Sequence, residues 1–203
     1  LLIGAPYNDG NGGSAGRAYL VLGGSTLASI SLSQADASYT GGAVSFAGYS
    51  VSVAGDMNAD GYADLAIGAF QASDGLVYSG CAYLVFGTAV PTSISLANAD
   101  GVYFGEAYGD RTGIALTIAG DTNSDGHDDL LVGGHHVDAL SGRAYLVLGG
   151  SGPIGLVPLS EADRKFMGSP GEQAGFPVTG AGDVNADGNA DLLVGAGANA
   201  EAG

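Results

Sequence analysis

Residues 53–68 read Val-Ala-Gly-Asp-Met-Asn-Ala-Asp-Gly-Tyr-Ala-Asp-Leu-Ala-Ile-Gly, an acidic turn that runs directly into an apolar segment. The stretch recurs as Ile118 to Gly133 and again as Ala181 to Gly195. Its first aspartate stands at positions 56, 121 and 183, so the period is 65 and then 62 residues. Self-similarity at a period of this length is typical of architectures in which each repeat is one supersecondary unit. The structure of one repeat therefore decides the fold of the chain.

Two further segments recur in the same register, and both are rich in residues that favour strands. They are residues 17–23, 81–87 and 143–149, and then residues 30–32, 94–96 and 156–159. In the second repeat they complete a set of four candidate strands, at residues 50–55, 64–69, 81–87 and 93–96. Four short strands per repeat, with no helical period between them, predict an all-β fold, a β-propeller of four-stranded antiparallel blades. A solenoid or a β-sandwich is the competing prediction.

The repeat spacing also predicts how the chain divides into blades. We expect a partial blade at 1–48, whole blades at 49–112 and 113–175, and a second partial blade at 176–203. Leu1 aligns with Leu65, so the first blade is expected to lack its innermost strand. Because propellers close with about 4–8 blades, we expect residues 1–203 to be a segment of one β-propeller within a longer chain.

The acidic turn has the spacing of a calcium-binding loop. Asp or Asn occupies positions 1, 3, 5 and 9 in all three copies, and glycine occupies position 6. Calcium takes about 6–8 oxygen ligands, and a tight loop can direct alternate side chains and the carbonyl of position 7 toward one centre. The predicted ligands of three Ca²⁺ ions are, loop by loop, Asp56, Asn58, Asp60, Tyr62 and Asp64; Asp121, Asn123, Asp125, His127 and Asp129; and Asp183, Asn185, Asp187, Asn189 and Asp191.

The residues after each loop separate it from a helical EF-hand. Each loop closes with Asp at position 9 and continues as Leu-Ala-Ile or Leu-Leu-Val, which predicts a strand. A single copy would also fit an Asx-type turn without metal, because Asp, Asn and Gly are common turn residues. Three copies in register favour metal, since clustered carboxylates without a cation would repel one another.

The charge of the chain limits its partners. It contains 21 Asp and Glu residues against 5 Lys and Arg, a formal net charge of −16, and 9 of the acidic residues occupy predicted ligand positions of the three loops. Such a charge excludes nucleic acid and anionic membrane surfaces as expected partners. No apolar run is long enough for a transmembrane helix, so we expect no membrane insertion. Cys81 is the only cysteine, so no intrachain disulfide can form.

No set of residues in the sequence is typical of an active site. The pair His135-His136 replaces the Ala-Pro of the repeat, and we interpret both as exposed loop residues. Ser45 and Ser50 have no histidine partner at a recognisable spacing, and Cys81 is interpreted as a semi-buried thiol at a strand start. We therefore predict no catalytic residue and no organic cofactor, and hence no enzyme activity in this segment.

Together these motifs resemble the FG-GAP repeat family, which includes the propellers of integrin α-subunits. Phe104-Gly105 and Gly4-Ala5-Pro6 match the elements that give the family its name, and Asp-x-Asn-x-Asp-Gly-x-x-Asp matches its calcium motif. Later copies of Gly-Ala-Pro depart from the pattern, as in Gly133-Gly134-His135, without removing a calcium ligand. The resemblance covers essentially the whole chain. It implies a seven-bladed, extracellular propeller in which calcium holds hairpin loops on one face.

Three functions follow as hypotheses. The first is a secreted or cell-surface binding and adhesion module, non-catalytic, with an unidentified protein or glycan partner on its loop face. The second is a non-catalytic propeller module of a secreted enzyme, whose catalytic domain would lie outside this segment. The third is a structural subunit of a surface assembly or filament, which would self-associate through open blade ends, since unpaired sheet edges are templates for pairing.

Overall fold

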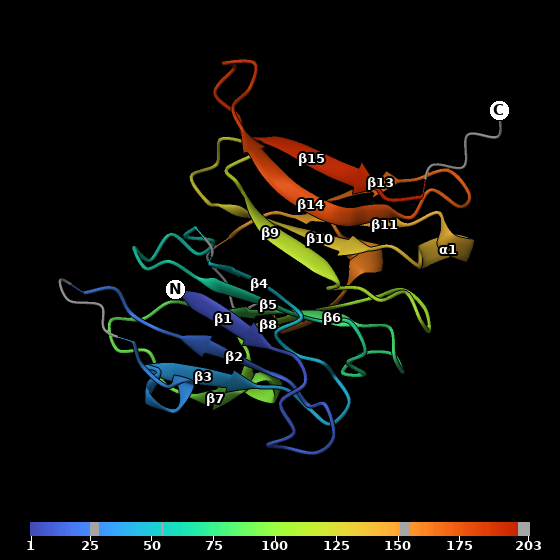
Figure 1. Ribbon diagram of the computed structural model, residues 1–203. Helices are drawn as coiled ribbons and strands as arrows, with labels where there is room; N and C mark the ends of the chain where they lie inside the picture. The colour runs from blue at the N-terminus through green and yellow to red at the C-terminus, as the bar shows by residue number, and fades with distance from the viewer. Residues whose placement is uncertain (25–28, 54, 151–154, 199–203) are drawn as a thin grey trace.

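The computed structural model describes residues 1–24, 29–53, 55–150 and 155–198. Within these ranges the strands form sheets that follow one another along the chain, from the blue N-terminal sheet to the red C-terminal pair in Figure 1. Helical structure in the described residues is limited to single turns: η1 (Leu32–Gln34), η2 (Leu96–Asn98), α1 (Val137–Leu140) and η3 (Leu159–Glu161). None of the described helices is long and apolar enough to cross a membrane.

Hydrogen bonds join the strands of the described ranges into four sheets, in which each strand pairs with the next one named. The first consists of β1 (Leu2–Ala5), β2 (Arg17–Leu20), β3 (Ala37–Thr40) and β7 (Ile94–Ser95). The second consists of β12 (Gly155–Pro158), β8 (Gly101–Phe104), β6 (Cys81–Val85), β5 (Leu65–Ala69) and β4 (Ser50–Val53). The third consists of β13 (Arg164–Met167), β11 (Arg143–Val147), β10 (Asp129–Gly134) and β9 (Ala115–Gly120). The fourth consists of β14 (Ala174–Gly182) and β15 (Asp191–Ala196).

Each of the two middle repeats contributes four antiparallel strands to its own sheet, as the sequence predicts. The second sheet contains β4, β5, β6 and β8, and the third contains β9, β10, β11 and β13. Strand β14 begins at Ala174, two residues before the expected start of the last repeat at residue 176. The all-β class and the four-stranded antiparallel sheets are therefore confirmed.

The predicted fourth strand of the second repeat, residues 93–96, does not pair with the sheet of its own repeat. Residues 94–95 do form a strand, β7, but it pairs in parallel with β3 of the preceding sheet, with Ile94 opposite Tyr39. The strand that pairs with β6 is β8, which follows the single turn η2 and places Phe104 opposite Cys81. β12 repeats this crossing one sheet later, where it pairs in parallel with β8. A segment of each repeat therefore borders the sheet before it.

Along the inner strands, successive side chains point to opposite faces of the sheet, and this explains how the sheets stack. In β5, Leu65, Ile67 and Ala69 belong to a buried cluster shared with the first sheet, whereas Ala66 belongs to a cluster shared with the third. Successive side chains of a strand point to opposite faces, so one strand can serve two interfaces. The same alternation recurs in β10, where Leu130 packs toward the second sheet and neighbouring residues toward the fourth. The second and third sheets are thus covered on both faces.

Small residues permit close contact between neighbouring sheets at the inner strands. A Cβ atom added to Gly68 would lie 2.1 Å from the carbonyl oxygen of Gly113, which begins the next repeat. Such a contact is sterically forbidden, so only glycine fits there without a backbone shift. Gly113 N in turn donates to the carbonyl of Gly133, at 3.0 Å. The glycine-rich composition is in part a requirement of this packing.

Candidate metal-binding loops

The three acidic loops are equivalent hairpin connections. Residues 56–64 join β4 to β5, residues 121–129 join β9 to β10, and residues 183–191 join β14 to β15 (Figure 1). In every case the two joined strands are antiparallel neighbours. The loops consequently lie at the same end of the stacked sheets, the end opposite Tyr7, Tyr49 and Tyr108.

The first loop folds around the carboxylate of Asp56. Its Oδ1 accepts a hydrogen bond from Asp60 N at 3.0 Å, and its Oδ2 accepts one from Gly61 N at 2.7 Å. Gly61 has φ +88°, a left-handed conformation that L side chains rarely adopt, which is why position 6 is glycine. Asn58 Oδ1 also accepts from Asp60 N, at 3.0 Å, and Asp60 Oδ1 accepts from Tyr62 N at 2.9 Å. The side-chain oxygens of positions 1, 3 and 5 thus order the loop backbone.

The other two loops reproduce this pattern closely. Asp121 Oδ2 accepts from Gly126 N at 2.9 Å, and Asp183 Oδ2 accepts from Gly188 N at 2.9 Å. Hydrogen bonds from the Asn123 side-chain amide and from His127 N lower the pKa of Asp125, so its carboxylate is favoured in the ionised form. The three loops therefore share one conformation in spite of their different residues at positions 2, 4, 7 and 8.

The aspartate at position 9 has a distinct environment. Asp64 and Asp129 are fully buried, whereas the residues at position 5 are exposed. Asp64 Oδ2 accepts from Met57 N and its Oδ1 from Gly87 N, both at 2.8 Å. Burial raises the pKa of Asp64, while the two backbone hydrogen bonds oppose that rise. This residue connects the loop to the end of β6, so it has a structural role in addition to its predicted role as a ligand.

Position 7 is expected to supply a backbone carbonyl, and its side chain differs among the loops. Tyr62 is 45% exposed. The imidazole of His127 instead contacts the preceding loop, with Nδ1 3.0 Å from the carbonyl oxygen of Met57. Asn189 Oδ1 accepts from Ser124 Oγ at 2.9 Å, which links the third loop to the second. The side chains of His127 and Asn189 thus join neighbouring loops, a role that sequence reasoning did not assign to them.

The loop side chains are held by hydrogen bonds in this structure. The amide of Asn58 donates to Asp60 Oδ2 at 2.9 Å, and the equivalent pairs in the other loops do the same at 2.8 and 3.0 Å. Over the described ranges, no group of three or more His, Cys, Asp or Glu side chains gathers as a metal site would require. The donors themselves fit calcium, because every predicted side-chain ligand offers oxygen and most carboxylate oxygens accept only one or two hydrogen bonds.

Asp128 links the first two loops, and the sequence pattern did not reveal it. Its Oδ2 accepts from Asp56 N at 2.8 Å, while its own N donates to Asp56 O at 3.2 Å. At the equivalent position of the next pair of loops Ala190 makes the backbone contact alone, with its N 3.0 Å from Asp121 O. Position 8 varies between Ala and Asp in the three copies, so the motif itself gives no signal for this contact.

A second recurring aspartate was also missed, although a signal for it existed. Asp36, Asp100 and Asp163 each follow one of the single 3₁₀ turns, in the pattern Leu-x-x-Ala-Asp. Their carboxylates accept from Leu22 N, Phe86 N and Leu148 N at 2.8, 2.8 and 2.9 Å. They tie the crossing segment of each repeat to the end of the strand before it. The in-register spacing of this pattern would have identified them.

The opposite end of the sheets carries exposed aromatic side chains. Tyr7, Tyr49, Tyr78 and Tyr108 are exposed there, and Tyr108 is 76% exposed. The rings of Tyr78 and Tyr108 meet edge to face with centroids 6.1 Å apart. Beside them lies a cavity of about 380 Å³, whose lining includes Phe70, Arg111 and His136.

The histidine pair is not the exposed loop feature that the sequence suggests. His135 and His136 are both partly buried, and their rings lie 4.3 Å apart because β10 has already ended at Gly134. His135 packs against Phe176 at 5.7 Å, and burial lowers the pKa of His135 to about 4. It is therefore neutral at physiological pH.

The other candidates for chemistry have structural roles. Ser45 Oγ donates to Ala15 O at 2.7 Å, and Ser50 Oγ donates to Gly113 O at 2.8 Å. Cys81 is completely buried, more deeply than the semi-buried position predicted, and burial raises the pKa of its thiol to about 12. A thiol in that environment stays protonated and unreactive. The environment of these three side chains activates none of them as a nucleophile.

A charged cluster fastens the third sheet to the connection before it. Glu106 Oε1 accepts hydrogen bonds from Arg143 Nη1 at 2.5 Å, from Lys165 Nζ at 3.2 Å and from the Tyr145 hydroxyl at 3.1 Å. Arg143 also pairs with Asp138. Burial would raise the pKa of Glu106, but the hydrogen bonds from Lys165, Arg143 and Tyr145 outweigh it and lower the pKa. The Glu106 carboxylate is thus stabilised in its ionised form.

Comparison with known proteins agrees with the repeat and its loops. Residues 47–80, which include the whole first acidic loop, match the FG-GAP repeat family. The chain is also 32% identical over 158 residues to mouse integrin alpha-IIb. That alignment covers 75% of this chain and 15% of the length of the integrin subunit. The resemblance found in the sequence is therefore confirmed, and the chain carries an FG-GAP repeat.

Proposed function

We propose that this chain is part of a calcium-stabilised, extracellular β-propeller that acts as a non-catalytic binding or adhesion module. The observation that carries the proposal is the presence of three equivalent loops, each with oxygen donors at positions 1, 3, 5 and 9, at one end of the stacked sheets. The similarity to an integrin α-subunit supports an adhesion-type module at the cell surface.

Calcium would act in this module by stabilising the hairpins. In each loop the side-chain oxygens of positions 1, 3 and 5 lie on a turn whose backbone is already ordered by hydrogen bonds. A bound Ca²⁺ would offset the repulsion among those carboxylates and draw the two joined strands together. Since neighbouring loops also contact one another through Asp128 and His127, an ordered loop would stabilise the next one.

The partner would contact the opposite end of the sheets. That end presents Tyr7, Tyr49, Tyr78 and Tyr108 and the cavity beside Arg111. Exposed aromatic rings and arginine are the residues that most often contribute binding energy at protein interfaces, and aromatic rings also stack on sugars. A protein or a glycan is thus the partner class that this surface fits, whereas the net charge of −16 disfavours nucleic acid.

The same proposal includes a closed ring. The second and third sheets are buried on both faces by their neighbours, which is the arrangement that a propeller continues around its axis. The FG-GAP resemblance supports seven blades, of which this chain would form a part.

Calorimetry tests the metal half of the proposal directly. Isothermal titration of the chelator-treated chain with CaCl₂ should give three sites, and scanning calorimetry should show a higher unfolding temperature with calcium than with a chelator. MgCl₂ at the same ionic strength is the matched control, because Mg²⁺ demands a smaller octahedral site. An unfolding temperature that is the same in calcium and in chelator would remove calcium from the proposed function.

A further inference from the structure

The cavity of about 380 Å³ beside the exposed tyrosines lies in the middle of the stack of sheets. Its lining comes mainly from the β5–β6 connection, the β8–β9 connection and the residues after β10. These connections belong to the second and third sheets, and the first and fourth sheets pack against the outer faces of those two. Complete repeats therefore form the cavity.

Arg111 is the charged residue of this cavity, and it has no counter-ion in the molecule. Its side chain is partly buried, yet within the described part of the chain the guanidinium forms no hydrogen bond and no ion pair, whereas Arg143 has two carboxylate partners. The carboxylate of Asp110, the preceding residue, is buried and accepts from Ala107 N at 2.7 Å. Since a partly buried charge without a partner costs free energy, Arg111 is available to an anion from outside.

The other side chains of the cavity leave the charge of Arg111 uncompensated. No Asp or Glu is among the described residues that line it. His136 is the other titratable group close to the guanidinium. Burial and then the positive charge of Arg111 lower the pKa of His136, so its ring is neutral at physiological pH. The cavity thus combines one cation with neutral aromatic and polar side chains.

The repeat shows that the backbone does not require arginine at this position. Phe46, Arg111 and Gln173 occupy equivalent places, each just before a residue that bridges to the turn of the preceding repeat. Their φ angles are +55°, +56° and +55°. Phe46 uses the place for packing, since its ring lies 5.2 Å from that of Phe70. The positive charge is therefore specific to the second of the three copies.

The loop beside Arg111 presents apolar side chains to water. Leu76, Val77 and Tyr78 are 43%, 62% and 42% exposed. The loop is nevertheless ordered, because Tyr78 N donates to Ser73 Oγ at 3.0 Å and Ser79 N donates to Leu76 O at 3.2 Å. Three successive exposed apolar residues are unfavourable in water unless they have a function. They indicate a surface that a partner covers.

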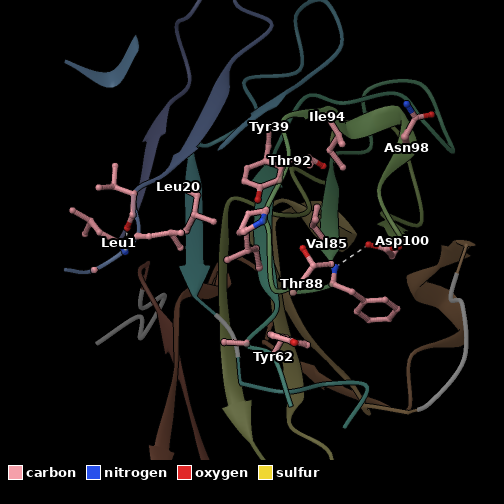
Figure 2. A pocket seen from close by; sticks show the side chains of 18 residues that line it. Leu1, Leu20, Tyr39, Tyr62, Val85, Thr88, Thr92, Ile94, Asn98 and Asp100 are labelled. Atoms are coloured by element: carbon pink, nitrogen blue, oxygen red, sulfur yellow. Dashed lines mark hydrogen bonds between the residues drawn. The ribbon is translucent and has the colours of Figure 1, made fainter. Parts of the chain in front are cut away.

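A larger cavity of the chain lacks this combination. It measures about 490 Å³, lies between the first and second sheets, and has no Arg, Lys or His side chain among the described residues that line it. Figure 2 shows apolar side chains such as Val85 around it, together with Asp100, which already accepts from Phe86 N at 2.8 Å. Its chemistry selects no ligand, whereas the cavity of Arg111 selects an anion.

We propose that the surface formed by Arg111 and the loop of residues 76–78 binds a protein segment in which one Asp or Glu side chain is flanked by apolar residues. The carboxylate would accept two hydrogen bonds from the guanidinium, the bidentate pairing that arginine favours. The flanking residues would cover Leu76, Val77 and the ring of Tyr108. Arginine and tyrosine are the residues that most often contribute binding energy at protein interfaces.

The aliphatic side chains favour a protein over a glycan as this partner. Leu76 and Val77 offer no hydrogen-bonding group in their side chains, whereas a sugar presents hydroxyl groups on most of its edges. The inference rests on the proposed function, because it names the chemistry of the partner for the surface assigned there.

Two peptides that differ in a single group test the proposal. They are the N-acetylated, C-terminally amidated tripeptides Leu-Glu-Leu and Leu-Gln-Leu, titrated into the ¹⁵N-labelled chain at millimolar concentration. The Glu peptide should shift the NMR signals of Arg111 Nε–H and of the backbone amides of Tyr78, Tyr108 and Gly109. The Gln peptide should bind about tenfold more weakly or less, because a charge-assisted hydrogen bond is lost.

Arg111→Gln is the decisive variant. The third copy already has glutamine at this place with the same backbone conformation, so the substitution is compatible with the fold. It should remove the preference for the Glu peptide over the Gln peptide. Arg164→Gln, at an exposed position of β13, is the matched control and should keep that preference. Circular dichroism confirms folding of both variants.

Three results would overturn the proposal. They are the absence of shifts around Arg111 with either peptide, equal affinity for the two peptides, and a preference that survives Arg111→Gln. D-glucuronate, which joins a carboxylate to a sugar ring, provides a further arm. If it bound beside Arg111 more tightly than the Glu peptide, the partner would be a glycan and the proposal would also fail.

The same titrations separate this inference from the calcium-dependent part of the proposed function. They are carried out in CaCl₂ and repeated in chelator. A preference that depends on Arg111 in both solutions, in a chain that calcium does not stabilise, would remove calcium and leave the inference standing. A chain that calcium stabilises but that does not distinguish the two peptides would remove the inference alone.

Discussion

The carboxylate of Asp64 accepts a hydrogen bond from the backbone amide of Gly87, with Asp64 Oδ1 and Gly87 N 2.8 Å apart. The same relationship recurs between Asp129 and Gly149, at 2.9 Å. The last residue of an acidic loop is thus hydrogen-bonded to the residue that follows a later strand of the same sheet, Gly87 after β6 or Gly149 after β11. In consequence, position 9 supports the fold with or without a metal ion, whereas position 5 lies on the exposed side of the loop.

The first prediction separates these two roles. Asp64→Ala removes the acceptor of Met57 N and Gly87 N, and we expect it to lower the free energy of unfolding by about 2–4 kcal/mol, since buried amides are left unpaired. The loss should appear in the presence of a chelator. Asp60→Ala, at an exposed position, should cost less than about 1 kcal/mol in chelator and should instead reduce the calcium response. Urea unfolding measures both, and equal losses in chelator would contradict the assignment.

The second prediction concerns calcium occupancy of the three loops. With dissociation constants of about 10⁻⁴–10⁻³ M, typical of extracellular modules, about 5 mM calcium should stabilise the chain by about 1–2 kcal/mol per site. Asp60→Ala, Asp125→Ala and Asp187→Ala should each remove one site from a titration. A variant that leaves the stoichiometry unchanged would show that its loop does not bind calcium.

The sequence predicted the sheets better than it predicted their borders. The repeat period located β4, β5 and β6 to within two residues, because alternating apolar residues and turn residues carry that information locally. The partner of residues 94–95 was not predictable in this way. The sequence of Ile94 and Ser95 favours a strand in any context. Only the long-range path of the chain decides that these residues pair with β3, and that β8 pairs with β6 instead.

The loops show the same division between local and long-range information. The spacing of Asp, Asn and Gly identified the residues that order each turn, and the positive φ of Gly61 follows from that pattern. Sequence spacing could not show that Asp128 reaches back to Asp56, because this contact depends on how far one sheet is rotated from the next. The burial of Asp64 likewise depends on packing that no loop motif encodes.

The third prediction tests the close approach of the inner strands. Gly68→Ala would place a Cβ atom 2.1 Å from Gly113 O, so the backbone of one sheet must move. Overpacking of this kind should destabilise the chain by about 1–3 kcal/mol or more. Gly13→Ala is the matched control, because nothing lies within 4 Å of an added Cβ atom there. Thermal unfolding that is equally affected by both substitutions would show that the contact at Gly68 is not the cause.

The fourth prediction concerns pH and the cluster around Glu106. Because the folded chain lowers the pKa of Glu106 below its ordinary value of 4.5, this carboxylate stabilises the fold above that pH, and the contribution is lost as the pH falls through its lowered pKa. Glu106→Gln should lower the free energy of unfolding at neutral pH by about 1–3 kcal/mol, since Arg143 is largely buried and loses a charged partner.

Urea unfolding from pH 7 down to pH 3 distinguishes this effect from a general acid transition. The unmodified chain and Glu106→Gln should converge as the pH falls, because the protonated carboxyl resembles the amide. Glu161→Gln is the control at an exposed position and should follow the unmodified chain at every pH. A gap between the unmodified chain and Glu106→Gln that stays constant down to pH 3 would mean that the substitution acts through packing, and that the ionised form of Glu106 contributes nothing to the stability of the third sheet.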